Sequence, residues 1–350
     1  MDKIRNRIIR DDASIFQALE KMDAEKVKML FVFNGSMDFL GILTIGDIQR
    51  SIIRKNDLGI PISMIIDKDK VYCSPNDSRE KVEGEMRRLR AECMPIVDSD
   101  GVLHDVVLWE DIFGDIKPDG REKIDLPVVI MAGGKGTRLK PLTNVIPKPL
   151  VPVGDKTIIE EIMDQFESIG CHKFYLSVNY KFEILKFYLD NLDHHYDMEF
   201  IKEDKPLGTI GSVSMLKGRI KTPFFVSTCD SLIDQDYRDA YDYHRSNNNE
   251  ITVISAIKRE VVPYGVIHTG EDGIMTGLSE KPENTYMLNT GIYILEPDVV
   301  DEIPEGEFFH ITDLIQKVRG RGGQVGCFPV SENAWKDMGD WDEYLKIIGR

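Results

Sequence analysis

The chain has 350 residues and a formal net charge of −16, from 60 acidic and 44 basic side chains. This length favours two domains, and the acidic balance argues against nucleic acid or an anionic membrane surface as a partner, because both attract clustered Lys and Arg. The five cysteines form no Cys-x-x-Cys pair, so we expect neither a zinc site nor a disulfide framework. The sequence has no signal-peptide core and no apolar run near the ~18 residues of a membrane span, so we expect a cytoplasmic protein.

The first 120 residues contain an internal repeat, with copies at about 1–56 and 63–118. Aligning the sequence with itself places Asp12 on Asn76 and Asp47 on Asp111. Each copy predicts a helix (about 15–25 and 79–90), a strand (29–33 and 94–97), a turn, a second strand and a second helix. Repeats of this kind usually pair about a pseudo-two-fold axis and leave clefts between the copies.

The segment 39–48, FLGILTIGDI, resembles the end of a CBS motif. The first domain, residues 1–120, is therefore similar to a tandem CBS pair, an α+β regulatory module that commonly binds adenine nucleotides. The resemblance implies that Thr44 contacts the phosphate and Asp47 the ribose of an adenine nucleotide effector. The second copy departs from the motif, with Leu108 in place of the threonine. In the alternative interpretation, the pair only mediates dimerisation, and Thr44 and Asp47 are a strand end and a helix cap.

A polar segment at 116–123, containing Pro and Gly, predicts the boundary to a second domain at 121–350. Beyond it, predicted strands alternate with predicted helices. This alternation predicts an α/β fold with a mostly parallel sheet, covered by helices and binding ligands at the carboxyl ends of its strands. The expected strands are 128–131, 174–178, 224–228, 251–257 and 324–330, and the expected helices include 157–168, 182–192 and 313–318.

The apolar strand 128–131 runs into a glycine-rich turn, AGGKGTR at 132–138. Such a turn exposes backbone N–H groups to phosphate, because glycine lets the backbone approach closely and take positive φ. Two familiar phosphate-binding patterns do not fit. A Rossmann fingerprint needs a third glycine where Leu139 stands, and a P-loop needs Ser or Thr where Gly136 follows Lys135.

The longer string GGxGTRLxPLTxxxPKPLxPxG closely resembles the signature of sugar-1-phosphate nucleotidyltransferases, which join a nucleoside triphosphate to a sugar phosphate and release pyrophosphate. The resemblance covers about 126–345 and implies a Rossmann-like, GT-A-like domain. It implies nucleotide binding by the turn and by the loop at 207–211, just after Glu203. The nucleotide-binding residues it implies are Ala132, Gly133, Gly134, Gly136, Thr137, Gly208 and Thr209.

Two polyanions must meet in this reaction, so positive charge and a divalent metal are required. The resemblance places Arg138 on the triphosphate and Lys148 between the α-phosphate and the incoming phosphate. Asp230 follows the strand 224–228, and Asp337 follows the strand 324–330. Mg²⁺ takes one or two carboxylates and fills its remaining positions with water and phosphate oxygens. The two aspartates match the family's metal pair, which implies Mg²⁺ as the cofactor.

Two later segments resemble the family's sugar site. Glu280 and Lys281 match the family's EKP segment, in which the Lys holds the sugar phosphate and the Glu a sugar hydroxyl. The alternative for this pair is a solvent-exposed ion pair. Asn289, Thr290 and Gly291 match the NTG segment that lines the sugar pocket. One position departs, because Asp340 stands where many members have Thr.

A CBS pair fused to this transferase resembles the guanylyltransferases of bacterial surface-sugar pathways, including the glucosamine-1-phosphate enzyme of legionaminic acid biosynthesis and mannose or heptose relatives. We therefore expect a homodimer that uses GTP and a sugar 1-phosphate. The product expected is a GDP-sugar such as GDP-glucosamine. The alternatives are a uridylyl- or thymidylyltransferase acting on glucose 1-phosphate, and a nucleotide-sensing regulatory protein with an inactive transferase fold. Since the sequence ends at Arg350, we do not expect the C-terminal domain of the bifunctional members.

Overall fold

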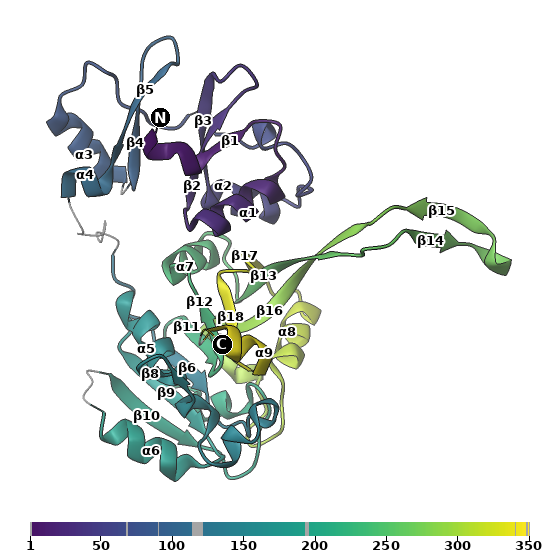
Figure 1. Cartoon of the computed structure of the whole chain (residues 1–350). Coiled ribbons are helices and arrows are strands. Elements are labelled where there is room, and N and C mark those ends of the chain that lie inside the picture. The colour runs from purple at the N-terminus through teal and green to yellow at the C-terminus, as the bar shows by residue number, and fades with distance from the viewer. Residues whose placement is uncertain are drawn as a thin grey trace. The chain divides into compact units, whose positions relative to one another are not determined.

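The computed structural model describes residues 2–67, 69–89, 91–113, 122–192, 196–339, 341–347 and 349. The chain divides into two compact units, Met1–Glu122 and Lys123–Arg350, and each is described by itself (Figure 1). Most of the predicted boundary segment and Asp340 lie outside the described residues. Within the ranges described, no helix has both the length and the apolar character needed to cross a membrane.

The first unit contains the predicted repeat. The order helix, strand, strand, helix is confirmed in both copies, and α1 begins at a capping box between Ser14 and Gln17. Phe31 from the first copy and Cys93 and Val106 from the second belong to one buried cluster, so the two copies share a core. The elements are α1 (Ile15–Glu25), β2 (Met29–Phe33), β3 (Phe39–Thr44) and α2 (Ile45–Ile53), then α3 (Arg79–Leu89), β4 (Cys93–Val97), β5 (Leu103–Leu108) and α4 (Trp109–Phe113), with β1 (Ile8–Arg10) pairing parallel to β2.

The second unit is built on a seven-stranded sheet with the order β10-β9-β6-β11-β16-β13-β17. Within it, β6 pairs parallel with β9 on one side and β11 on the other. The predicted α/β fold with a mostly parallel sheet is confirmed, except that β16 runs antiparallel to both of its neighbours. The strands are β6 (Val128–Met131), β9 (Lys173–Val178), β10 (Asp197–Lys202), β11 (Phe224–Thr228), β13 (Ile251–Val261), β16 (Glu283–Leu295) and β17 (Val325–Ser331).

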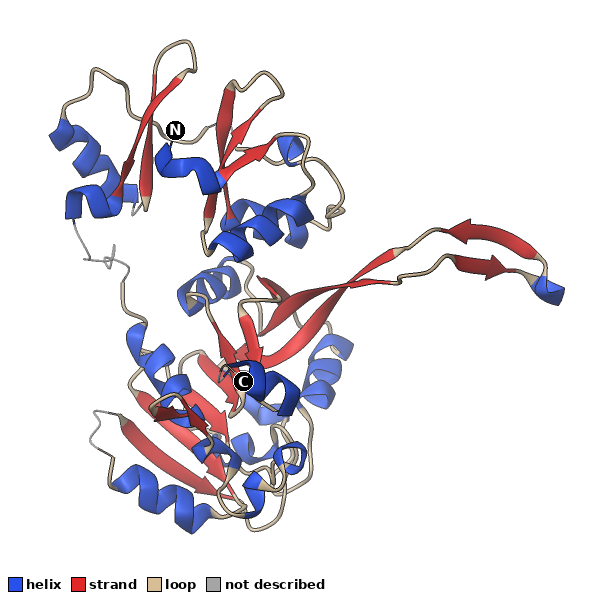
Figure 2. Ribbon diagram, viewed as in Figure 1, coloured by secondary structure: helices blue, strands red, loops and turns tan. Residues whose placement is uncertain are grey.

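Helices cover both faces of this sheet (Figure 2). Val128 and Ile130 of β6 belong to one buried cluster and Val129 to another, because successive strand residues point to opposite faces. Since both faces are buried, the strand is apolar throughout rather than alternating. The first cluster includes residues of α5 (Ile158–Ser168), α6 (Phe182–Asp190), α7 (Tyr237–Ser246) and α9 (Trp341–Ile347), and the second includes residues of α8 (Ile311–Gly320).

One segment extends away from the sheet of the second unit (Figure 1). β13 and β16 continue as a paired ribbon whose outer part is formed by β14 (Val266–Thr269) and β15 (Met275–Ser279). We call residues 258–287 the arm. The predicted strand 251–257 is too short, because its apolar pattern ends where the buried sheet ends while the backbone pairing with β16 continues to Val261.

Candidate active site

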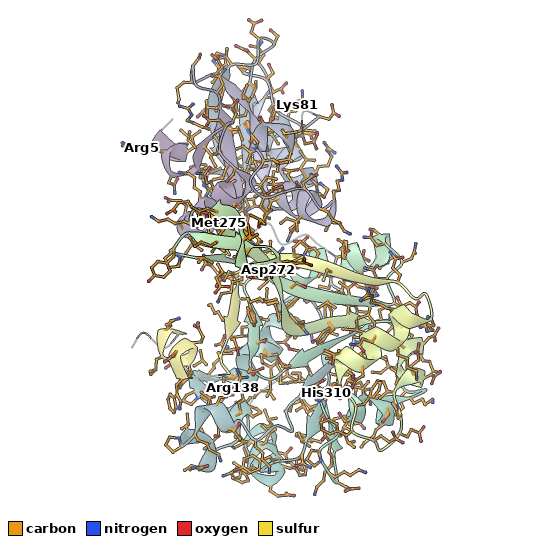
Figure 3. The ribbon with its side chains drawn as sticks, turned by 90° about the vertical axis from the view of Figure 1, so that its right-hand side faces the viewer. Arg5, Lys81, Arg138, Asp272, Met275 and His310 are labelled. Carbon is orange, nitrogen blue, oxygen red and sulfur yellow. The ribbon has the colours of Figure 1, made fainter. Side chains whose placement is uncertain are left out.

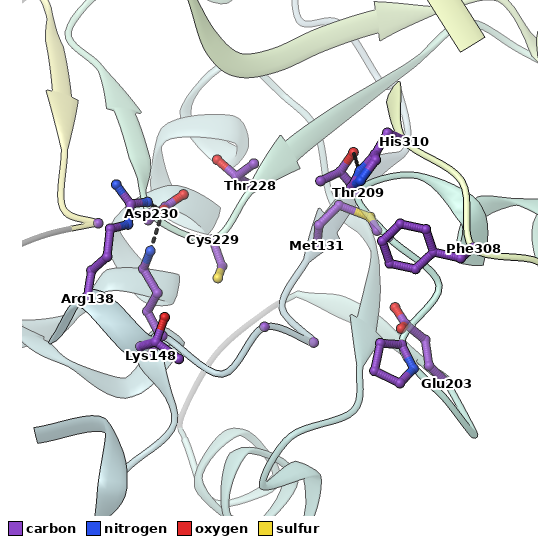
Figure 4. A pocket seen from close by; sticks show the side chains of 17 residues that line it. Met131, Arg138, Lys148, Glu203, Thr209, Thr228, Cys229, Asp230, Phe308 and His310 are labelled. Atoms are coloured by element: carbon purple, nitrogen blue, oxygen red, sulfur yellow. Dashed lines mark hydrogen bonds and ion pairs between the residues drawn. The ribbon is translucent and has the colours of Figure 1, made fainter. Parts of the chain in front are cut away.

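A cavity of about 420 Å³ lies where β6 and β11 end, at the carboxyl edge of the parallel strands. Arg138, Lys148 and Asp230 gather at one end, and Glu203 and Phe308 lie at the other (Figure 4). The remaining lining residues are Met131, Gly133, Gly134, Gly136, Thr137, Pro206, Gly208, Thr209, Thr228, Cys229, His310 and Gly339.

The glycine-rich turn after β6 forms one wall of the cavity. Its start is fixed to β9, because the Ala132 N–H donates a hydrogen bond to the Ser177 carbonyl (2.8 Å). Gly136 has φ +61°, and a Cβ there would lie 2.8 Å from Thr143 and 3.0 Å from Lys148. Only glycine therefore fits, and its absence of a side chain lets Lys148 pack directly against the turn. Gly133, Gly134 and Thr137 line the cavity, whereas Ala132 is buried behind it.

A short strand pair brings the two predicted metal ligands together. β12 (Ser231–Ile233) and β18 (Trp335–Asp337) pair antiparallel, with Ser231 opposite Asp337. Asp230 therefore lies beside Asp337, and its carbonyl accepts a hydrogen bond from the Met338 N–H (2.8 Å). The pairing joins two segments about a hundred residues apart in the sequence, at the edge of the cavity.

The two predicted cations, Lys148 and Arg138, form ion pairs with these carboxylates. Lys148 Nζ forms an ion pair with Asp230, and both side chains are largely buried. Arg138 lies 3.9 Å from Asp230 and 4.0 Å from Asp337, and its side chain is 60% exposed. Gly339 packs against the cluster, since a Cβ there would lie 2.6 Å from Asp337 Oδ1 and 2.8 Å from Arg138 Nη2.

The charges in this cluster shift the acidity of its members. Burial raises the pKa of Asp337 above its ordinary value and the neighbouring Asp230 raises it further, against the opposing effects of the Gly339 N–H, Arg138 and Lys148. Burial also raises the pKa of the Cys229 thiol to about 12, so this cavity-lining cysteine stays protonated. Asp337 thus lies where additional positive charge is favourable.

The opposite end of the cavity is built from two loops. Gly208 has φ +84°, and a Cβ there would lie 2.4 Å from the Phe309 carbonyl oxygen. The Phe309 N–H donates to the Leu207 carbonyl (3.0 Å), and the Ile311 N–H donates to Thr209 Oγ1 (2.9 Å). These bonds hold the segment before α8 against the loop at 207–211, which is predicted to bind the nucleotide.

That contact brings in two residues that the sequence did not predict. Phe308 is 61% exposed, and its ring meets the His310 ring edge-to-face with centroids 4.8 Å apart. An exposed aromatic ring at a cavity wall offers a flat surface on which a nucleobase can stack. The available sequence signal is the aromatic run at 308–310 just before a predicted helix, although its position beside Gly208 depends on tertiary packing.

Glu203 is a buried carboxylate at the same end of the cavity. Its Oε1 accepts a hydrogen bond from Ser177 Oγ (2.6 Å), and its Oε2 accepts one from the Leu207 N–H (3.1 Å). Each carboxylate oxygen has capacity for a further hydrogen bond. Glu203 therefore provides a fixed acceptor pair, oriented by the strands and loop around it.

A second cavity, of about 350 Å³, adjoins the first and shares Met131, Thr209, Thr228 and His310 with it. Asn289 and Gly291 line it, at a bulge where the β13–β16 register shifts. Gly291 has φ +83°, and a Cβ there would lie 2.8 Å from Thr228 Oγ1.

The middle residue of the predicted NTG segment, Thr290, points into the protein. Thr290 is buried, and its Oγ1 donates a hydrogen bond to the Ile254 carbonyl (2.8 Å). Asn289 Nδ2 donates to Tyr293 Oη (2.7 Å) within the strand that carries the bulge. The structure thus brings Asn289 and Gly291 to the cavity and uses Thr290 to anchor the bulge.

Glu280 and Lys281 lie on the arm, and neither lines these two cavities. Pro282 follows them and accepts a hydrogen bond from the Val262 N–H (3.0 Å) across the ribbon. From Lys281 to Asn289 the chain is nearly all β16, so the two are separated by about 25 Å at ~3.3 Å per residue. Their sugar-binding role stays a prediction.

Comparisons with known proteins identify the family of each unit. A family model described as nucleotidyl transferase matches residues 127–349. The chain belongs to this family. A model of the CBS domain matches residues 5–54 and 62–117, so the first unit is a pair of CBS domains.

Relatives within the nucleotidyl transferase family include a mannose-1-phosphate guanyltransferase of Yarrowia lipolytica, 36% identical over 183 residues, or 50% of each chain. A mannose-1-phosphate guanyltransferase of Schizosaccharomyces pombe is 31% identical over 229 residues, covering 63% of this chain and 62% of the relative. The match thus spans only about half to two thirds of these relatives. The crystal structure of HddC from Yersinia pseudotuberculosis aligns with a TM-score of 0.51 at 26% identity, covering 64% of this chain and 98% of that one.

The two carboxylates Asp230 and Asp337 fit a magnesium ion. Asp230 and Asp337 supply hard oxygen donors in a place where further positive charge is favourable. In the part of the chain that the structure describes, no three or more His, Cys, Asp or Glu side chains are grouped to hold a metal. The remaining ligands of Mg²⁺ would therefore be water and phosphate oxygens, as this ion prefers.

In the CBS pair, Thr44 and Asp47 form the capping box of α2. Asp47 is buried and accepts hydrogen bonds from the Thr44 N–H (2.7 Å) and Thr44 Oγ1 (2.7 Å). It also forms ion pairs with Lys70 and Arg50. Burial would raise the pKa of Asp47, but the bonds from Lys70 and Thr44 outweigh it and hold the pKa below its ordinary value. Nucleotide binding at Asp47 stays a prediction, and would require Lys70 to move.

The second CBS domain has a cavity of its own, of about 530 Å³. It is lined by Asp111, which aligns with Asp47 in the repeat, and by Lys3 from the start of the chain. Lys3 Nζ donates to Asp111 Oδ2 (2.8 Å) on the surface. Arg79 and His104 add potential positive charge to the same cavity.

Proposed function

We propose that the second unit transfers a nucleotidyl group from a nucleoside triphosphate to a sugar 1-phosphate and releases pyrophosphate. One observation carries the proposal: the glycine-rich turn, the cations Arg138 and Lys148, and the carboxylate of Asp230 meet at one cavity, with Asp337 beside Asp230 and 4.0 Å from Arg138. Membership of the nucleotidyl transferase family supports the reaction class.

In the proposed reaction an oxygen of the sugar phosphate attacks the α-phosphorus. The bond from that phosphorus to the bridging oxygen breaks, and pyrophosphate leaves in line. A general base is unnecessary, because the attacking phosphate oxygen is already ionised near neutral pH. Mg²⁺ held by Asp230 and Asp337 would neutralise charge on the triphosphate.

The two cations take different roles in this proposal. Lys148 is largely buried against the glycine turn, so it provides a point charge at a defined position for the α-phosphate and the attacking phosphate. Arg138 is 60% exposed at the rim of the cavity, where its planar fork suits the leaving pyrophosphate. The turn residues Gly133, Gly134 and Thr137 would bind the triphosphate through the backbone.

We assign GTP as the nucleotide. The relatives compared above are guanyltransferases, and Glu203 offers a pair of fixed acceptor oxygens at the base end of the cavity. Guanine presents adjacent N–H donors on its Watson–Crick edge, whereas uracil and thymine present one N–H between two carbonyl acceptors. A carboxylate at this position therefore favours guanine and repels the pyrimidine carbonyls.

The sugar is assigned to the adjoining cavity, which Asn289 and Gly291 line. The relatives favour mannose 1-phosphate, and the fusion with a CBS pair favours glucosamine 1-phosphate. Thr209 and Thr228 line both cavities, so a sugar bound in the second would lie within their reach.

A pyrophosphate-release assay over four nucleoside triphosphates and a panel of sugar 1-phosphates tests these assignments. We expect the highest kcat/KM with GTP and with mannose or glucosamine 1-phosphate. In Glu203→Gln, one acceptor oxygen becomes a donor, so the preference for GTP over UTP should fall about 10-fold or more. If UTP or dTTP with glucose 1-phosphate were the best pair for the unmodified enzyme, the guanylyl assignment would be wrong.

We also assign an adenine nucleotide effector to the CBS pair, in the cavity of its second domain. That cavity combines Lys3 and Arg79, which suit phosphate, with the carboxylates of Asp77, Asp105 and Asp111, which suit ribose hydroxyls. AMP, ADP, ATP and S-adenosylmethionine should be compared by thermal shift, with Arg79→Ala as the matched variant. Absence of stabilisation by all four would leave dimerisation as the role of the pair. Tight nucleotide binding there without turnover on any sugar phosphate would instead indicate a regulatory protein.

A further inference from the structure

The ring of Phe308 is held in place and yet left uncovered. Phe308 lies just before α8, and its side chain is 61% exposed. Its ring meets that of His310 edge-to-face, with the two planes at 84°. The His310 ring is in turn held at the next loop, because its Nδ1 lies 3.3 Å from Thr209 Oγ1. The aromatic pair is therefore fixed at one side and open at the other.

The backbone on either side of Phe308 is fixed by close packing. Its two neighbours, Glu307 and Phe309, lie directly on two glycines of the adjacent loop. A Cβ on Gly211 would lie 2.7 Å from the Glu307 carbonyl oxygen, and one on Gly208 would lie 2.4 Å from that of Phe309. The position of the ring is thus set by its backbone and does not depend on burial of the ring itself.

The linings of the two cavities show which ligand the ring meets. Phe308 lines the first cavity only, whereas Ile311 and Thr312 line the second only, and His310 lines both. The chain from Phe308 to Thr312 therefore runs along the boundary between the two cavities. Phe308 is on the side that we assign to the nucleotide, and the residues that follow it are on the side that we assign to the sugar.

Within the first cavity, the ring lies apart from the phosphate end. Figure 4 shows Phe308 on the same side as Glu203 and away from Lys148, and Figure 3 shows His310 apart from Arg138. An uncharged ring adds nothing to phosphate binding, whereas its π-face matches that of a base. A triphosphate bound at the cations would extend its base toward this ring.

We infer that the Phe308 ring stacks on the nucleobase of the triphosphate, an assignment that rests on the proposed function of this cavity. The ring holds the base by its face, while Glu203 binds its edge. Stacking tolerates every base, because each has a π-face, so Phe308 supplies affinity and Glu203 supplies discrimination. The base covers the ring when the nucleotide binds, which accounts for the exposure of the ring in the free protein.

Steady-state kinetics in the pyrophosphate-release assay tests the role of the ring. Phe308→Ala should raise the KM for GTP about 10-fold or more and leave kcat within about threefold, because stacking is the same in the ground state and the transition state. Phe308→Tyr keeps a π-face and should retain the KM of the unmodified enzyme. Phe308→Leu keeps only an apolar side chain and should resemble Phe308→Ala. An unchanged KM in Phe308→Ala, or full recovery in Phe308→Leu, would overturn the inference.

Two nucleotides that differ only at the edge of the base separate stacking from edge recognition. ITP lacks the 2-amino group of GTP and has nearly the same ring face. Phe308→Ala should therefore reduce kcat/KM for both by the same factor, within about threefold, whereas Glu203→Gln should reduce the advantage of GTP over ITP. A loss in Phe308→Ala that is confined to GTP would contradict stacking.

Tryptophan fluorescence measures the contact without turnover. A stacked guanine quenches an indole, so GTP and Mg²⁺ without sugar phosphate should quench Phe308→Trp more strongly than the unmodified chain, whose three tryptophans give the background. Phe187→Trp is the matched control, because Phe187 is 72% exposed on α6 and does not line this cavity. Equal quenching in the two variants would overturn the inference even if transfer is observed. Quenching confined to Phe308→Trp, with no transfer to any sugar phosphate, would refute the proposed function and support the base contact.

Discussion

Replacing Lys148 tests the role of the buried cation most sharply. Lys148→Ala removes the charge that pairs with Asp230 and that we place on the phosphate under attack. One fixed charge-assisted contact to a developing anionic transition state is worth about 3–4 kcal/mol, so kcat/KM should fall ~100- to 1,000-fold. The loss should appear mainly in kcat, because Lys148 holds the α-phosphate and the attacking phosphate together, and this bridging contact is strongest when the two approach each other in the transition state.

The variant should remain folded, with a modest loss of stability. The lysine and aspartate side chains are 9% and 16% exposed, so breaking the pair costs up to about 3 kcal/mol in the metal-free protein. Bound Mg²⁺ should recover part of this cost by compensating Asp230. Urea unfolding with and without Mg²⁺ checks both statements.

Lys135→Ala is the matched control for Lys148→Ala. Lys135 belongs to the same glycine-rich turn but is exposed and does not line the cavity. Its replacement should change kcat/KM less than threefold in the pyrophosphate-release assay. Equal losses in the two variants, or less than threefold loss in Lys148→Ala, would refute the assignment of Lys148.

Gly291→Ala combines left-handed backbone strain with a steric overlap with Thr228, whereas Gly322→Ala, at φ +87° in open space, carries only the strain of about 1 kcal/mol. Urea unfolding should therefore show a larger loss of stability in Gly291→Ala, and the pyrophosphate-release assay should show a loss of turnover in Gly291→Ala alone. Burial lowers the pKa of His244 to about 4, below the ~6.5 of an unfolded chain. The free energy of unfolding is therefore unaffected by this side chain above pH ~6.5, where it is neutral in both states, and decreases as the pH falls toward 4, because only the unfolded chain then binds the proton. His244→Gln should therefore flatten the pH dependence of the unfolding free energy by up to about 3 kcal/mol over that window, and an unchanged slope would contradict it. Lys70 and Arg50 both pair with the buried Asp47, but their side chains are 13% and 57% exposed. Lys70→Ala should therefore destabilise the first unit by about 2 kcal/mol and Arg50→Ala by less than about 1 kcal/mol, and thermal unfolding compares the two variants.

Local patterns predicted the features that depend on neighbouring residues. The run at 128–131 is apolar because β6 is buried on both faces. The turn after it needs glycine because a side chain at Gly136 would overlap Thr143. The repeat in the first unit was visible because each copy has its own turn and helix cap. Asp230 and Asp337 could be proposed from their positions after strands, although only the β12–β18 pairing shows them side by side.

Features that depend on distant packing were not predicted. Phe308 and His310 reach the cavity only because the segment before α8 packs on Gly208, and no local periodicity reports such a contact. The arm was missed because its strands pair outside the buried sheet, where the apolar pattern of a core strand is absent. Glu280 and Lys281 match a motif in sequence, but their position on the arm follows from the ladder between β13 and β16, which continues outward to the pair Val261–Glu283.

The central claim is that this cavity joins a nucleotide to a sugar phosphate. The most direct measurement is ³¹P NMR of the full chain with GTP, mannose 1-phosphate or glucosamine 1-phosphate, and Mg²⁺. The account predicts equal amounts of a GDP-sugar and pyrophosphate, with neither formed by Asp230→Asn or in the presence of a chelator. Absence of any nucleotide sugar across the four nucleoside triphosphates, or its undiminished formation by Asp230→Asn, would contradict the account.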